Sequence, residues 1–179
     1  MHYDEDLELR DPVQKAARQW ADRYPDSQGF SGLVSLIRAY SVAVRSIEAV
    51  LRPFGLNLSR YEVLLLLSFT RAGHLPTMRL RDLLMVHGSS VTYLVDKLEA
   101  AHLVERDPDP DDGRVSLVCI TETGRELVDT SSHALCDAGF GVFANLTGDD
   151  AAQLIAILAQ IRTSRAPNTP HSARHLGGL

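Results

Sequence analysis

Side chains that can donate hydrogen bonds to nucleic acids gather in one short part of the chain. They are the hydroxyl and ammonium groups of Ser89, Ser90, Thr92, Tyr93 and Lys97. Such groups bind phosphate oxygens and base edges, as do the free backbone N–H groups at the start of a helix. Other roles stay open, since Ser89 can serve as a helix N-cap and Lys97 can be an ordinary solvated lysine. We therefore predict DNA contacts from these five residues.

A second charged group lies in the segment PDPDDGR, residues 108–114, whose proline, aspartate and glycine residues are typical of a turn. Arg114 at the end of this segment would be attracted by the negative potential of the DNA minor groove. We expect Asp112 to orient its guanidinium by a charge-assisted hydrogen bond. The alternative is an exposed salt bridge within the turn. The surroundings are acidic for a loop that meets DNA, as the charged residues show: Arg106, Asp107, Asp109, Asp111, Asp112 and Arg114.

The elements that must position these side chains lie between residues 78 and 121. In order, the pattern predicts a strand over 78–80, helices over about 81–86 and 89–101, and strands over 103–107 and 115–120. A helix pair followed by a β-hairpin is typical of a winged helix-turn-helix, whose second helix enters the major groove. The predicted fold class is therefore mainly α with a small β-hairpin wing.

Further helices are predicted on both sides of this unit. Asp11 and Pro12 are typical of the first residues of a short helix. Ser59 and Glu62 have the S-x-x-E spacing of a capping box, and the segment 147–150 is expected to cap a last helix. Apolar stripes predict two longer helices, over about 31–52 and 123–145.

The flanking helices carry more apolar surface than one small winged unit can bury. We therefore expect a two-fold homodimer through the N- and C-terminal helices, which places two recognition helices about one DNA turn apart on a pseudo-palindromic operator. The expected regions are an acidic N-terminal extension with a short helix (1–29), a dimerisation helix (30–58), the DNA-binding region (59–122), C-terminal dimerisation helices (123–162) and a disordered tail (163–179).

Composition limits the other classes of function. The net charge of −5 means that DNA affinity must come from a few local cations. No apolar run approaches the roughly 20 residues that cross a bilayer, and the acidic N-terminus lacks a signal-peptide core, so we expect a cytoplasmic protein without a membrane partner. No metal-ligand spacing, phosphate-binding glycine loop or nucleophile elbow is found, so neither a cofactor, a metal nor enzyme activity is expected. Cys119 and Cys136 are expected to be buried thiols, since no motif supports a redox sensor.

Residues 30–162 resemble the MarR family of bacterial transcription regulators. The similarity is strongest in VHGSSVTYLVDKLEAAHLVER and in DPDDGRVSLVCITETGREL, which holds the wing pattern of Asp112 and Arg114 and a following T-x-x-G turn. FGLNLSRYEVLLLL also resembles a core helix of the family. The resemblance implies a homodimer that binds double-stranded DNA as a repressor. It also implies release by a small, often aromatic or anionic, ligand in a cleft between the dimerisation and DNA-binding regions.

Five residues are candidates for such a ligand site: Trp20, Arg38, Arg45, Glu62 and Arg71. A cation that faces an apolar cleft can hold a carboxylate or phosphate, and Arg38 is the first choice because it interrupts an apolar stretch. The alternatives are ordinary surface charges for the arginines, the capping box for Glu62 and core packing for Trp20. An alternative function is a winged-helix protein-interaction module without DNA binding, which the acidic charge balance motivates.

Overall fold

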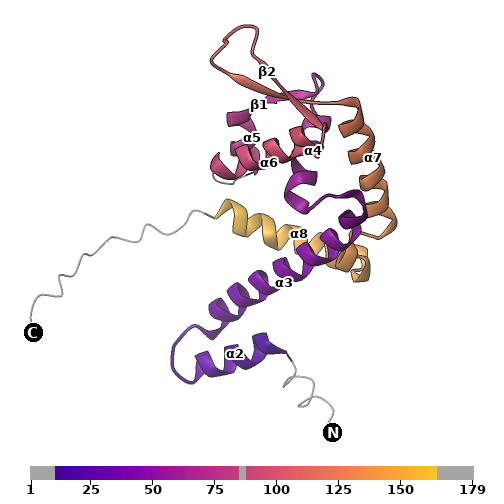
Figure 1. The fold of residues 1–179 in the computed structure, drawn as a ribbon. Coiled ribbons are helices and arrows are strands. Elements are labelled where there is room, and N and C mark those ends of the chain that lie inside the picture. The colour runs from indigo at the N-terminus through magenta and orange to yellow at the C-terminus, as the bar shows by residue number, and fades with distance from the viewer. Residues whose placement is uncertain (1–10, 85–87, 165–179) are drawn as a thin grey trace, which may run out of the picture. The chain divides into compact units, whose positions relative to one another are not determined.

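The computed structural model describes residues 11–84 and 88–164, and the chain divides into one unit up to Ala144 and a second from Asn145 (Figure 1). The first unit holds α2 (Pro12–Ala21), α3 (Ser27–Leu51), the 3-10 turn η1 (Arg52–Phe54), α4 (Leu58–Ser68), β1 (His74–Pro76), α5 (Thr77–Leu84), α6 (Gly88–Ala100), β2 (Val104–Pro108), β3 (Ser116–Ile120) and α7 (Glu122–Asp137). The 3-10 turn η2 (Gly141–Asn145) lies at the boundary, and α8 (Gly148–Thr163) forms the second unit.

The core of the first unit lies between α4, α6 and the sheet. Leu64 and Leu67 of α4 are fully buried, as are Val95 of α6 and Val118 of β3. The apolar set predicted for the second helix of the pair is buried as expected: Val91, Leu94, Val95 and Leu98. Burial of one face fixes the rotation of α6 about its axis and leaves its polar face outside.

The three strands form an antiparallel sheet in the order β1–β3–β2. Cys119 in the central strand pairs with His74 on one side and with Glu105 on the other. The strand predicted over 78–80 is wrong, because residues 77–84 are helical and Leu80 is fully buried in the core. The strand that completes the sheet is β1, which lies just before α5. It ends at Pro76, whose backbone has no N–H to continue the hydrogen bonding between strands.

The connection between the hairpin and α7 is fixed by Thr121 and Gly124. Thr121 caps α7 by accepting a hydrogen bond from the Gly124 backbone N–H at 3.0 Å, and its hydroxyl donates to the His102 carbonyl at 2.9 Å. A Cβ at position 124 would lie 2.2 Å from the Leu103 carbonyl oxygen. The T-x-x-G turn therefore closes the base of the hairpin against the end of α6, and only glycine permits this approach.

Three helix boundaries differ from the predictions. The capping box at Ser59 is wrong, because α4 starts two residues earlier and the Asn57 side chain accepts from the Arg60 backbone N–H at 3.0 Å. The second helix starts at Ser27, since the Asp26 carboxylate accepts from the Gly29 N–H at 2.9 Å. The single helix predicted over 123–145 ends at Asp137, because residues 139–141 all adopt a positive φ that no α-helix tolerates.

Two other predictions concern the termini and the thiols. The capping of α8 by Thr147 and Asp150 is confirmed, with both reciprocal hydrogen bonds present. The expectation of two buried thiols is wrong, since Cys136 is exposed on α7 and Cys119 is half-buried on β3. The predicted acidic extension and disordered tail lie in part outside the described residues.

Within the described chain, no helix is long and apolar enough to cross a membrane.

Candidate DNA interface and ligand pockets

The outward face of α6 presents polar side chains beside its buried stripe. Ser90, Thr92, Tyr93 and Lys97 are exposed, and the side chain of Ser89 lies outside the described residues. Tyr93 is 61% exposed, although a tyrosine ring would usually seek burial. The Lys97 Nζ atom stands 5.6 Å from the centroid of its ring, so the two side chains form one surface. The structure thus gathers four of the predicted contact residues on one open helix face.

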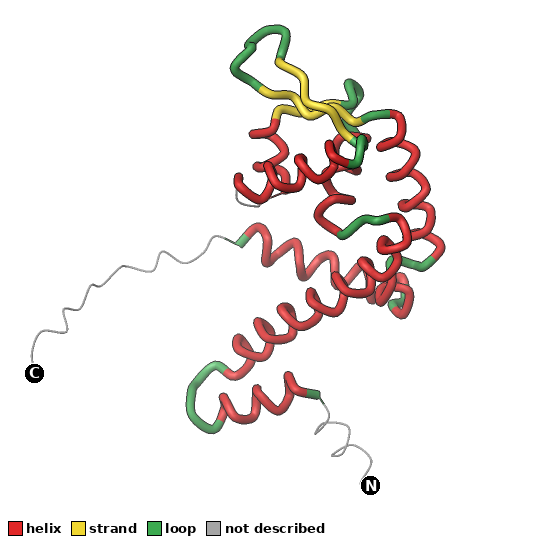
Figure 2. Tube along the Cα trace, in the orientation of Figure 1, coloured by secondary structure: helices red, strands yellow, loops and turns green. Residues whose placement is uncertain are grey.

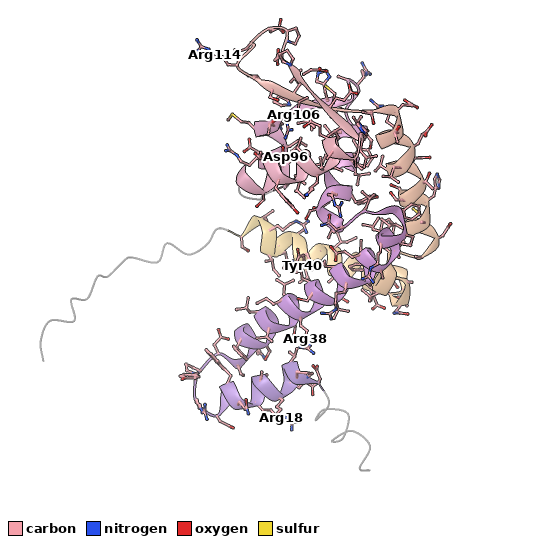
Figure 3. The ribbon with its side chains drawn as sticks, viewed as in Figure 1. Arg18, Arg38, Tyr40, Asp96, Arg106 and Arg114 are labelled. Atoms are coloured by element: carbon pink, nitrogen blue, oxygen red, sulfur yellow. The ribbon has the colours of Figure 1, made fainter. Side chains whose placement is uncertain are left out.

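The β2–β3 hairpin projects beyond α4, α5 and α6 (Figures 1 and 2). Arg114 lies at its far end and points away from the protein, as Figure 3 shows. The Asp112 carboxylate accepts a hydrogen bond from the Arg114 backbone N–H at 3.0 Å. Asp112 therefore shapes the turn rather than orienting the guanidinium, which corrects the predicted role. Among the described residues, no ion pair holds the Arg114 side chain, so it is available to a ligand.

Arg106 connects the hairpin to α6, a role that the sequence interpretation missed. Its Nη2 atom lies 2.5 Å from Asp96 Oδ1, and its Nη1 atom pairs with Glu99. A signal was present in the strand alternation, since Arg106 stands two residues after the buried Val104 and so shares the face that packs on α6.

The five candidate ligand residues do not form one site. Arg38 and Arg45 line a shallow pocket of about 320 Å³ on α3 together with Ile37 and Ser41. Glu62 lies in a different pocket of about 190 Å³ beside Leu83 and Leu84.

The remaining candidates have other surroundings. Trp20 stacks on Phe30 with ring centroids 4.3 Å apart, and its Nε1–H donates to the Pro25 carbonyl at 3.0 Å. This contact matches the packing alternative for Trp20. Arg71 is exposed in the loop after α4. Partial burial raises the pKa of the Glu62 carboxyl above its ordinary value.

A larger groove of about 730 Å³ separates α4 from α7, and the sequence interpretation missed it. Tyr61, Phe69 and Phe140 provide its aromatic walls, and the Tyr61 hydroxyl lies 2.9 Å from the Ser132 hydroxyl. Three carboxylates and one guanidinium lie along α7: Glu122, Glu126, Asp129 and Arg125. Its volume is within the range of small-molecule sites in proteins. No sequence pattern predicts this groove, because its walls come from two helices that lie far apart in the chain.

An exposed polar helix face, a preceding helix anchored in the core by Leu80, and a hairpin with an outward-pointing arginine at its end define a winged helix-turn-helix DNA-binding protein. The MarR family model matches residues 54–115. Sco5413, a MarR family transcriptional regulator from Streptomyces coelicolor, is 34% identical with a TM-score of 0.70, and the match covers 75% of this chain and 93% of that one. The chain belongs to the MarR family, and it is a DNA-binding transcriptional regulator.

Two further solved structures show what similar proteins bind. A cysteine-to-serine mutant of MarR from E. coli, complexed with operator DNA, is 25% identical with a TM-score of 0.65, covering 73% of this chain and 93% of that chain. CouR from Rhodococcus jostii RHA1, bound to p-coumaroyl-CoA, is 28% identical with a TM-score of 0.63, covering 79% and 95%. Sco5413 is a transcriptional regulator, in agreement with the prediction that the chain is not an enzyme.

Proposed function

We propose that the protein is a repressor that binds a pseudo-palindromic operator as a homodimer and leaves it when a small effector binds. The observation that carries this proposal is the joint exposure of Tyr93 and Lys97 on α6 and of Arg114 on the hairpin. A helix in the major groove contacts base edges, and an arginine on the adjacent hairpin inserts into the minor groove, where the potential is negative. The net charge of −5 is compatible with this, because the cations that matter are local.

Exposed apolar side chains on two helices support a dimer. Leu33, Ile37 and Tyr40 recur along α3 and are 57%, 57% and 67% exposed. Ile155 and Ile161 on α8 are also exposed. Apolar rows of this kind usually mark a protein interface. A second copy of the chain is the simplest partner, because a two-fold axis also brings two copies of α6 to one DNA duplex.

The two pockets favour different effectors. Arg38 and Arg45 share a pocket with the Ser41 hydroxyl, and this arrangement suits a carboxylate or phosphate. The groove between α4 and α7 has aromatic walls but three carboxylates, so it suits a neutral aromatic molecule better than an anion. Whichever site is used, the effector must bind the DNA-incompetent arrangement more tightly, or it shifts no equilibrium.

DNA binding is tested by capturing genomic fragments with the purified full chain at low salt. Retention should fall steeply as salt rises, because neutralised phosphates release counterions. A set of fragments that share an inverted repeat is the expected result. Failure to retain any fragment at low salt would favour the alternative of a winged module that binds proteins.

The dimer is tested by sedimentation of an Ile37→Asp variant. A charge in the apolar row of α3 should shift the protein towards the monomer and abolish cooperative operator binding. Ser35→Asp places the same charge on an exposed polar position of the same helix and is the matched control. A monomeric wild-type protein at all concentrations would contradict the proposal.

The effector sites are separated by two variants and two probes. Benzoate, an aromatic anion, and phenol, an aromatic molecule that is neutral at pH 7, are titrated into the operator complex. Arg38→Gln should abolish a response to benzoate, whereas Phe140→Ala should abolish a response to phenol. A probe that binds the protein yet leaves the operator complex intact at saturation is not an effector.

A further inference from the structure

The hairpin and the recognition helix are joined at their base by a short connection. Only residues 101–103 separate α6 from β2, and Leu103 and Val104 are buried. Leu117 and Val118 of β3 are buried as well, and beyond them the hairpin extends away from the helices (Figure 2). Its loop is held by bonds within itself, such as that from the Val115 N–H to the Asp112 carbonyl at 2.8 Å. The position of Arg114 relative to α6 therefore depends on contacts along the hairpin.

Two contacts fasten the middle of the hairpin to the helices below it. The Thr77 hydroxyl of α5 donates to the Ser116 carbonyl of β3 at 3.1 Å. On the other strand, Arg106 reaches across to α6, where its guanidinium bridges Asp96 and Glu99. Figure 3 shows Arg106 between Asp96 on α6 and the hairpin that ends in Arg114. The guanidinium is planar and presents separate N–H donors, so one side chain can hold both carboxylates at once.

The same bridge changes the charge that α6 presents. Asp96 is next to Lys97 and one helical turn after Thr92, on the exposed side of the helix. Carboxylates at this position repel DNA phosphates, and the side chains of Asp96 and Glu99 are 56% and 41% exposed. Arg106, at 28% exposure, is the least exposed of the three, and its positive charge offsets part of theirs. Ion pairs this exposed contribute little to the free energy of unfolding. The bridge therefore acts by holding the hairpin in position and by reducing the negative charge on α6.

We propose that Arg106 is a positioning residue for DNA binding, which sets the wing against the recognition helix and shields the carboxylates of Asp96 and Glu99 from the DNA. It acts through these two partners and does not itself need to touch DNA. This inference rests on DNA binding by α6 and the wing, and the test below includes a variant that fails only if that binding mode is wrong.

The first test compares conservative and neutral replacements of Arg106 in the full chain, with a captured operator fragment. Arg106→Lys keeps the charge but lacks the planar fork, so it should weaken binding almost as much as Arg106→Gln, by about tenfold (1.4 kcal/mol). Arg52→Lys and Arg52→Gln, at an exposed site on η1, are the matched controls and should bind normally. Wild-type affinity in Arg106→Lys would reduce the role of Arg106 to a simple positive charge and overturn the proposal.

A double-mutant cycle isolates the role of the partners. In the background Asp96→Asn with Glu99→Gln, Arg106→Gln should cost much less affinity, because there is no carboxylate left to hold or to shield. An equal loss in both backgrounds would mean that Arg106 acts on DNA directly and would overturn the proposal. Thermal unfolding of each variant checks that the fold is intact.

Two further measurements distinguish positioning from contact and from general stability. Arg106→Gln should leave the slope of log affinity against log salt unchanged, whereas loss of a phosphate contact lowers the slope by about 1. Amide exchange at Asp109 and Val115 in the wing should accelerate in Arg106→Lys without a change in global unfolding. If Arg106→Lys leaves wing exchange unchanged, the positioning role is wrong. If Lys97→Gln and Arg114→Ala both bind like wild type, the DNA-binding mode itself is wrong.

Discussion

The Asp112 carboxylate accepts a hydrogen bond from the backbone N–H of Arg114 at 3.0 Å and so holds the turn that carries the arginine side chain outward. An amide oxygen can accept the same bond, but a methyl group cannot. Asp112→Asn should therefore bind operator almost like wild type, whereas Asp112→Ala should lose affinity several-fold. Both are measured by fluorescence anisotropy with a labelled operator.

The neighbouring Asp111 provides the matched control for this turn. Asp111→Ala removes the same charge from an exposed position and should not weaken binding. Equal losses in Asp112→Asn and Asp112→Ala would mean that the negative charge of Asp112, not the turn, supports the arginine.

Arg114 itself should contribute a contact to the DNA. Arg114→Ala is expected to weaken operator binding by roughly 1–3 kcal/mol and to lower the salt slope by about 1. The reason is that the guanidinium, exposed at the end of the hairpin, is free to enter or border the minor groove. Gel shifts over a series of salt concentrations measure both quantities. Unchanged affinity would remove the hairpin from the binding mechanism.

Gly124 should be irreplaceable for packing rather than for DNA contact. A Cβ there would lie 2.2 Å from the Leu103 carbonyl, and the backbone at this point is fixed by Thr121. Gly124→Ala is expected to lower the free energy of unfolding by roughly 1–3 kcal/mol, the usual cost of an overpacked site. Gly32→Ala is the matched control, since Gly32 is also helical and a Cβ there meets nothing within 4 Å.

Urea titration of the full chain measures both glycine variants. Gly32→Ala should stabilise the protein by up to about 1 kcal/mol, because alanine has the higher helix propensity. Two variants that change stability in the same direction would contradict the packing argument for Gly124.

Strong periodicity made the recognition helix predictable. Val91, Leu94, Val95 and Leu98 follow the spacing of one helix face, and their burial decides how α6 lies on the core. The two strands of the hairpin and its turn-rich loop were predictable for a similar reason, since the loop residues favour turns and the strand residues alternate. Local sequence was enough to predict an element wherever only one type of secondary structure was favoured.

The predicted start of α4 was wrong because two sequence signals compete there. Asn57 and Ser59 are both good N-caps, and local sequence cannot choose between them. The choice involves a distant residue, because Glu48 of α3 accepts from the Leu58 N–H at 3.4 Å. The groove between α4 and α7 also joins residues far apart in sequence, such as Tyr61 and Ser132. Such sites follow from tertiary packing, which no pattern along the chain records.

The two thiols should differ sharply in reactivity. Burial, the hydrogen bond from Cys119 Sγ to Asp107 Oδ2 at 3.4 Å, and the charges of Asp107 and Glu105 raise the Cys119 pKa to about 11. The thiolate is the reactive form, so iodoacetamide at neutral pH should label the exposed Cys136 well before Cys119. Mass spectrometry of digested protein reads out both sites.

Removing the carboxylate at Asp107 tests the cause of this low reactivity. In a Cys136→Ser background, Asp107→Asn should lower the Cys119 pKa and speed its alkylation. The raised pKa of Cys119 also makes the free energy of unfolding depend on pH. Above the ordinary thiol value of 9.0 the unfolded chain loses this proton, while the folded chain keeps it until about 11. The free energy of unfolding should therefore fall as pH rises between these values, and Cys119→Ser should remove that part of the fall. An identical pH profile in Cys119→Ser would show that the thiol keeps its ordinary pKa on β3.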